Sequence, residues 1–208
     1  GLKQGLKIGN WLGFIDVATF LMRYNDMMEF SFGKFAPADT NDALLNFGGL
    51  GFKSINIGKT EVSGIELSIT GKGNLTHNIK ATILAGYTYM NPISLEPNKV
   101  YEVLDESAFL SDENGNQEEI SNLTYNNSSS DPSVLKYRYK HIAKLDFELE
   151  YKNISLGFSC RYNDFMKNID RIFTDPSLEI IGISGINEAR EKYKNGDFIV
   201  DARLGYQL

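Results

Sequence analysis

The sequence has little of what most enzymes and metalloproteins need: it contains one cysteine, Cys160, and two histidines, His77 and His141. A single cysteine cannot form a disulfide within the chain, and no grouping of cysteine and histidine offers a zinc site. No recognised catalytic motif surrounds either histidine, and no phosphate-binding or dinucleotide-binding glycine motif occurs. These absences predict a protein that is not an enzyme and has no cofactor.

Basic charge and long apolar runs are also scarce. The formal net charge is −6, which argues against a nucleic-acid partner because such a surface clusters lysine and arginine. No run approaches 18 apolar residues, so the sequence predicts no transmembrane helix. Glycine, tyrosine and phenylalanine are plentiful, with 19, 11 and 13 residues, and this composition suits a β-rich protein.

The strongest pattern lies in the stretch from Tyr137 to Tyr151. Alternate positions beginning at Tyr137 are aromatic or apolar except for His141, and the positions between them are charged except for Ile142. Successive side chains of a strand point to opposite faces, so this period of two predicts one long strand with an apolar face and a charged face. From Tyr139 to Tyr151, about twelve steps of roughly 3.3 Å tilted by about 40–45° span roughly 28–30 Å, which matches the apolar thickness of a bilayer.

A strand of a soluble protein can carry the same alternation. In that alternative, the chain is an all-β carbohydrate-binding or ligand-binding sandwich, and the face with Leu145, Phe147 and Leu149 is buried against a second sheet.

Six further stretches are predicted to be strands, at residues 2–9, 14–32, 52–70, 79–89, 154–162 and 198–208. Tight turns are expected at 71–74 and 151–153, and long polar loops at 33–49, 91–134 and 168–195. The last loop is predicted to contain a helix over 185–193, with Ser184 as its N-cap and Gly196 past its end.

Short turns that alternate with long loops are typical of outer-membrane barrels. The predicted fold is therefore an all-β, antiparallel up-and-down transmembrane β-barrel with long extracellular loops. Residues 1–208 are predicted to form a partial barrel of about seven long strands.

Several segments resemble the barrel of TonB-dependent outer-membrane receptors, in the SusC/RagA-like form of Bacteroides-type bacteria. They are I-D-V-A-T-F-L-M-R-Y-N-D-M-M-E-F (Ile15–Phe30), I-N-I-G-K-T-E-V-S-G-I-E-L-S (Ile55–Ser68), A-G-Y-T-Y (Ala85–Tyr89) and N-G-D-F-I-V-D-A-R-L-G-Y (Asn195–Tyr206). The pair formed by Asn56-x-Gly58 and Gly64-x-Glu66 is the most specific of these signals.

The resemblance implies a barrel of about 22 strands that is filled by an N-terminal plug. It implies active import of a large, scarce nutrient such as a siderophore, glycan or peptide, driven by the TonB complex through the plug. It also implies outer-membrane lipid around the barrel and a possible SusD-like surface lipoprotein as a partner. No plug, TonB box or signal peptide is recognised, and seven strands are an odd number, so the sequence is expected to be a fragment from the C-terminal half.

Two sets of residues are candidates for function. Charged side chains on the polar face are expected to line the lumen, either as plug-facing structural polarity or in contact with solute: Lys144, Asp146, Glu148, Arg161, Asp201 and Arg203. The loop residues Asp112, Asn114 and Asn116 have the spacing of the first half of a calcium loop. Gln117 and Leu123 stand where that loop needs its glycine and its closing glutamate, so a solvated acidic loop is the alternative.

Overall fold

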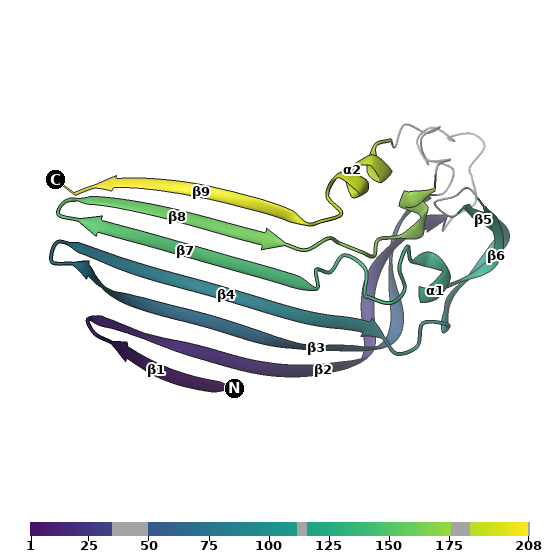
Figure 1. The fold of residues 1–208 in the computed structure, drawn as a ribbon. Helices are drawn as coiled ribbons and strands as arrows, with labels where there is room; N and C mark the ends of the chain where they lie inside the picture. The colour runs from purple at the N-terminus through teal and green to yellow at the C-terminus, as the bar shows by residue number, and fades with distance from the viewer. Residues whose placement is uncertain (35–49, 112–115, 176–183, 208) are drawn as a thin grey trace.

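The computed structural model describes residues 1–34, 50–111, 116–175 and 184–207, and its largest part is one long antiparallel sheet (Figure 1). The sheet contains seven strands and is not closed within the described residues. In spatial order, the strands are β1 (Leu2–Ile8), β2 (Trp11–Lys34), β3 (Leu50–Thr76), β4 (Ile79–Ser94), β7 (His141–Tyr151), β8 (Ile154–Asn163) and β9 (Asp197–Tyr206). The predicted partial barrel of seven antiparallel strands is confirmed.

The pairing register shows that the predicted alternation is carried across the sheet. Leu145 of β7 lies opposite Ala85 of β4 and Cys160 of β8, and Cys160 lies opposite Val200 of β9. Residues paired in this way share a face of the sheet, and their neighbours in sequence share the other face. The sheet therefore has an apolar face that includes Leu145 and a polar face that includes Lys144.

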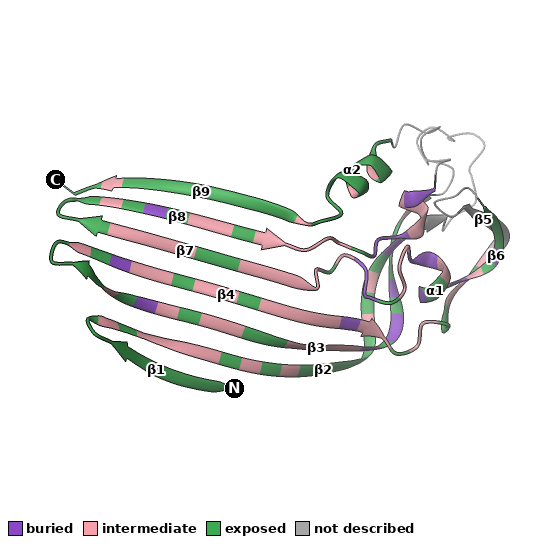
Figure 2. Cartoon of the chain, in the orientation of Figure 1, coloured by how far each residue is buried: buried purple, intermediate pink, exposed green. Residues whose placement is uncertain are grey.

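The apolar face is not buried under another layer of the described chain. Leu204, Val200 and Leu156 are 80%, 57% and 52% exposed, and Leu145 is exposed while Phe147 and Leu149 are half-buried (Figure 2). A sandwich would have sequestered the side chains of Leu145, Phe147 and Leu149 against a second sheet. The soluble-sandwich alternative is therefore not favoured.

A separate layer lies at one end of the sheet, where the long connections meet (Figure 1). It contains a second sheet made of β5 (Val100–Ser111) and β6 (Gln117–Thr124), the helix α1 (Tyr125–Ser128) and the 3-10 helix η2 (Arg171–Thr174). We call these elements, together with residues 27–34, 50–58 and 129–140, the loop layer. The sequence predicted only a long loop over 91–134, and that prediction is wrong for β5, β6 and α1.

The loop layer contains most of the buried apolar side chains of the described chain (Figure 2). Ile55, Ile57, Tyr125 and Leu135 form one core cluster, which Met27, Val62 and Tyr101 cover. In the described part of the seven-stranded sheet outside the loop layer, few apolar residues are buried, and they include Ala81 and Pro92 of β4. The loop layer is thus stabilised by burial of its own apolar side chains, whereas the sheet depends on its backbone ladders and on what surrounds it.

The turn after β3 lies later than the sequence predicted. Gly71 and Gly73 belong to β3, and the turn is formed by His77 and Asn78. A Cβ atom at position 73 would lie 2.7 Å from Cγ of Trp11, so this glycine makes room for an indole ring rather than a turn.

The strand that begins with Tyr137 in the sequence prediction begins at His141 in the structure. Tyr137 has a φ of 58°, which breaks an extended strand. Its phenol donates to Asp170 Oδ2 at 2.5 Å, so a tertiary contact outweighs the local alternation. The ten steps of β7 still span about 23–25 Å at a tilt of about 40–45°, close to the apolar band of outer-membrane barrels.

The short helix α2 (Ile186–Lys192) lies in the predicted segment. The prediction of Ser184 as its N-cap is wrong, because Gly185 holds that position with a φ of 82° and no side-chain cap bond. Gly196 follows the helix as predicted, with a φ of 85°. Among the described residues, no helix is long and apolar enough to cross a membrane.

Candidate functional site

The polar face contains an ion-pair cluster that spans three strands. Arg203 of β9 binds Asp146 of β7 through two hydrogen bonds, Nη1 to Oδ2 at 2.9 Å and Nη2 to Oδ1 at 3.1 Å. Ser159 of β8, between them, accepts from Arg203 Nη1 at 2.7 Å and donates to Asp146. Glu148 is 3.8 Å from Arg203 Nη2. A bidentate arginine–carboxylate interaction of this kind fixes the orientation of both side chains.

Gly157 leaves room for the ion-pair cluster. This residue of β8 lies between Glu148 and Arg203 in the register. A Cβ atom there would lie 2.8 Å from Nε and Nη2 of Arg203, so any larger side chain would occupy the path of the guanidinium across β8.

All six charged residues that the sequence singled out for the polar face share that face by register. Lys144 lies opposite Gly86 and Arg161, and Asp201 lies opposite Ser159. The structure joins Asp146, Glu148 and Arg203 in the ion-pair cluster. That the face lines a lumen stays a prediction at this point.

A shallow hollow of about 470 Å³ lies on the polar face, centred on β3, β4 and β7. The absence of a side chain at Gly86 leaves the space open. The residues that line it include the polar and charged Asp16, Glu66, Ser68, Thr88 and Lys144. Asp16 and Glu66 were not selected as candidates from the sequence. Their position between apolar residues of their strands could have assigned them to the polar face.

Strands β2 and β3 bend together toward the loop layer (Figure 1), and the Asn56-x-Gly58 motif lies where their pairing is irregular. The pairing is irregular there, between Tyr24 and Met28. Asn56 Oδ1 accepts from the backbone N–H of Gly58 at 2.8 Å, and Gly58 has a φ of 82°. A β-bulge of this kind bends a strand and increases its twist.

The second motif glycine, Gly64, is packed against a ring and a carbonyl. A Cβ atom at this position would lie 2.2 Å from the Tyr89 carbonyl oxygen and 2.5 Å from Cζ of Phe20. We therefore expect Gly64→Ala to destabilise the barrel by about 1–3 kcal/mol, because the strands must move apart. Urea unfolding of the complete receptor in detergent, followed by gel mobility of unheated samples, measures this loss.

Gly5→Ala is the matched control, since no described residue lies within 4 Å of a Cβ atom at that position of β1. Equal unfolding midpoints for the two variants would contradict the steric role of Gly64.

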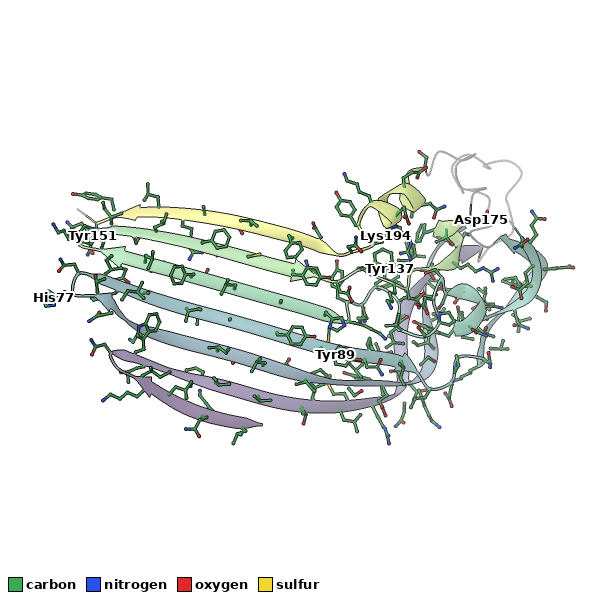
Figure 3. All side chains as sticks on the ribbon, in the orientation of Figure 1. His77, Tyr89, Tyr137, Tyr151, Asp175 and Lys194 are labelled. Carbon is green, nitrogen blue, oxygen red and sulfur yellow. The ribbon has the colours of Figure 1, made fainter. Side chains whose placement is uncertain are left out.

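An aromatic group lies at the loop end of the apolar face. Tyr87 OH is 2.7 Å from His141 Nδ1, and the rings of Tyr89 and His141 are 5.1 Å apart. Tyr151 lies at the opposite end of β7, where Figure 3 also shows His77. Aromatic residues at both ends of spanning strands are typical of the interfacial girdles of outer-membrane barrels.

The loop layer contains a buried ion pair that sequence reasoning missed. Lys136 and Asp170 are each 1% exposed, and Lys136 Nζ lies 2.5 Å from Asp170 Oδ1. Lys136 Nζ also lies 3.0 Å from Ser128 Oγ, and Ser31 Oγ donates to Asp170 Oδ1 at 2.9 Å. Burial lowers the pKa of Lys136, and the negative charge of Asp170 opposes that shift.

This buried pair joins segments that are far apart in the sequence: β2, the end of α1, the connection before β7 and the connection after β8. Ser31 and Asp170 are separated by 139 positions. No local pattern could therefore have revealed the contact.

The candidate calcium site stays a prediction, because Asp112 and Asn114 lie outside the described residues.

The family model described as "TonB dependent receptor-like, beta-barrel" matches residues 1–208. A search of curated proteins found no match. The match agrees with the open antiparallel sheet, its two contrasting faces and the aromatic residues at its ends. The family match confirms the predicted location in the outer membrane. It also confirms the predicted class of protein, because TonB-dependent receptors are transporters. The chain belongs to the family of TonB-dependent receptor β-barrels.

Proposed function

We propose that this chain forms part of the wall of an outer-membrane receptor that actively imports a large, scarce nutrient with energy from the TonB complex. The observation that carries the proposal is the contrast between the two faces of the sheet. One face exposes Leu145, Leu156 and Val200, as lipid contact requires. The other holds the ion-pair cluster and the polar hollow, as a hydrated interior requires.

The proposal includes further strands and a plug domain in the complete receptor. An open sheet leaves one edge of β1 and one edge of β9 unpaired in the seven-stranded order. Unpaired backbone groups in a bilayer cost several kcal/mol each, so neighbouring strands are needed on both sides.

On this proposal, Lys144, Asp146, Glu148, Arg161, Asp201 and Arg203 face the barrel interior. Asp146 and Arg203 satisfy one another, which suits a structural surface against a plug better than direct capture of a solute. TonB acts through the plug, and outer-membrane lipid surrounds the apolar face. A SusC/RagA-like receptor of this kind would also take a SusD-like lipoprotein as a lid over the loop layer.

Uptake by cells tests the function and sorts the solute classes. Radiolabelled ferric siderophore, maltooligosaccharide and pentapeptide serve as probes, in cells with and without the receptor and with and without TonB. We expect receptor-dependent accumulation of one class that is lost without TonB. Accumulation that is equal with and without TonB would contradict active transport and indicate a passive pore.

A further inference from the structure

Glu29 is the one glutamate of the described chain whose two buried side-chain oxygens have no hydrogen-bond partner. It lies on β2 beyond the bulge, opposite Ile55 of the core cluster. Ser31, two positions along the strand, points into the buried ion pair. A carboxylate without partners in such a place is costly to keep ionised.

Glu29 lies outside the membrane-spanning part of the sheet. The first residue of β7, His141, is in line with Tyr89, Ile65 and Thr19 across the sheet. Glu29 lies farther along β2 than Thr19 and past the irregular pairing that ends at Met28. Its surroundings are therefore the loop layer and the water around it.

The charged groups near Glu29 in the described part of the chain do not include one that binds its carboxylate. Lys136 and Arg138 attract a negative charge there, and Asp170 repels it. Lys136 is already bound to Asp170 at 2.5 Å. The other titratable groups that face this site are the phenols of Tyr101, Tyr125 and Tyr137. With Glu29 protonated, the buried Lys136 and Asp170 balance one another. With Glu29 ionised, the buried groups carry an excess negative charge, because Arg138 is exposed.

Burial accordingly raises the pKa of the Glu29 carboxyl from 4.5 to about 7, although Lys136 and Arg138 act in the opposite direction. The raised value places the loss of this proton near neutral pH.

We propose that Glu29 makes the loop layer a pH-sensitive device, in which the layer is closed while Glu29 is protonated and opens more readily once Glu29 is ionised. The ionised carboxylate competes with Asp170 for Lys136 and adds an unsatisfied charge to the core cluster. Both effects weaken the contact that joins β2, α1 and the connections around β7 and β8. The proposal goes beyond transport itself and does not depend on which solute is carried.

The direction follows from the two protonation equilibria. Below about pH 4.5, Glu29 is protonated in the closed and the opened layer, so opening is independent of pH. As the pH rises from about 4.5 to about 7, the opened layer releases the proton first, and the closed form loses stability. Above about pH 7, the loss is complete.

Hydrogen exchange of the complete receptor in detergent micelles measures the opening. Three amides report on it, since Leu135 N–H donates to Pro92, Lys136 N–H to the Tyr125 hydroxyl and Tyr137 N–H to Asn168. In the wild type, we expect the protection factors of residues 134–137, corrected for intrinsic exchange, to fall at least about tenfold between pH 5 and pH 8. In Glu29→Gln, which is always neutral, they should stay constant.

Glu61→Gln is the control, because Glu61 of β3 pairs with the exposed Arg23 at 2.8 Å and lies outside the core cluster. It should keep the pH dependence of the wild type. Glu29→Met provides a second neutral variant if Glu29→Gln does not fold. A wild type whose protection is independent of pH, or a neutral variant with the full wild-type dependence, would overturn the proposal.

Discussion

Replacing Lys136 with methionine is expected to weaken the loop layer by about 3–5 kcal/mol, because the change leaves Asp170 charged and buried without its cation. Of its side-chain donors among the described residues, Asp170 would retain the hydroxyls of Ser31 and Tyr137. The side chains of Lys136 and Asp170 are 2% and 1% exposed, so water cannot replace the lost partner without opening the layer. Hydrogen exchange at Leu135 and Tyr137 measures the free energy of opening.

Lys59→Met is the matched control. Lys59 pairs with Glu96 at 3.6 Å, but its side chain is 56% exposed, and such pairs contribute at most about 1 kcal/mol. The double variant Lys136→Met with Asp170→Asn should be less unstable than the two single changes combined, since neither member of the pair is left as an unpaired charge. Equal stability of Lys136→Met and Lys59→Met would contradict the structural importance of the buried pair.

The second large effect concerns the apolar face of β7. Phe147 lies opposite Ile83 and Phe158, near the middle of the strand. If that face meets lipid, Phe147→Arg places a charge near the centre of the bilayer and should destabilise the barrel by about 2–4 kcal/mol. The measurement is the amount of folded receptor, recognised by its gel mobility before heating, in isolated outer membranes.

Glu148→Arg, one residue away, lies on the polar face opposite Thr82 and Gly157. It loses a 3.8 Å contact with Arg203 and gains repulsion from it, but water on that face screens both effects. Assembly should therefore stay close to that of the wild type. A shift of one residue in register would exchange the two outcomes, and equal tolerance of both arginines would show that the strand is not a lipid-facing wall.

The seven long strands could be predicted because each repeats a pattern that depends only on neighbours in sequence. The residues from His141 to Tyr151 alternate because the sheet has one apolar and one polar face. The strands β8 and β9 pair in the same sheet and therefore alternate in the same way. Short turns then determine three pairs of neighbours, β1 with β2, β3 with β4 and β7 with β8. The polar-face residues Asp146 and Arg203 could be selected from this pattern, but their contact across β8 also needed Gly157.

The loop layer could not be predicted, because its contacts join distant segments. Pairing of β5 with β6 shifts register between Val103 and Ala108, so no regular alternation marks the hairpin. Lysine and aspartate are rarely buried without a partner, so neither Lys136 nor Asp170 is expected to be buried from its own neighbours in sequence. Each is buried because the other comes from a different connection between strands. Local pattern also misled at Gly73, where a glycine that suggests a turn accommodates Trp11.

We infer that the odd-numbered face of β7 meets outer-membrane lipid and that the even-numbered face meets the barrel interior. Photocrosslinking in intact outer membranes tests this directly. The photoreactive amino acid p-benzoylphenylalanine is placed at position 147 in one variant and at position 148 in another. We expect lipid-linked receptor from position 147 and none from position 148. Lipid-linked product from position 148 alone, or equally from both positions, would contradict it.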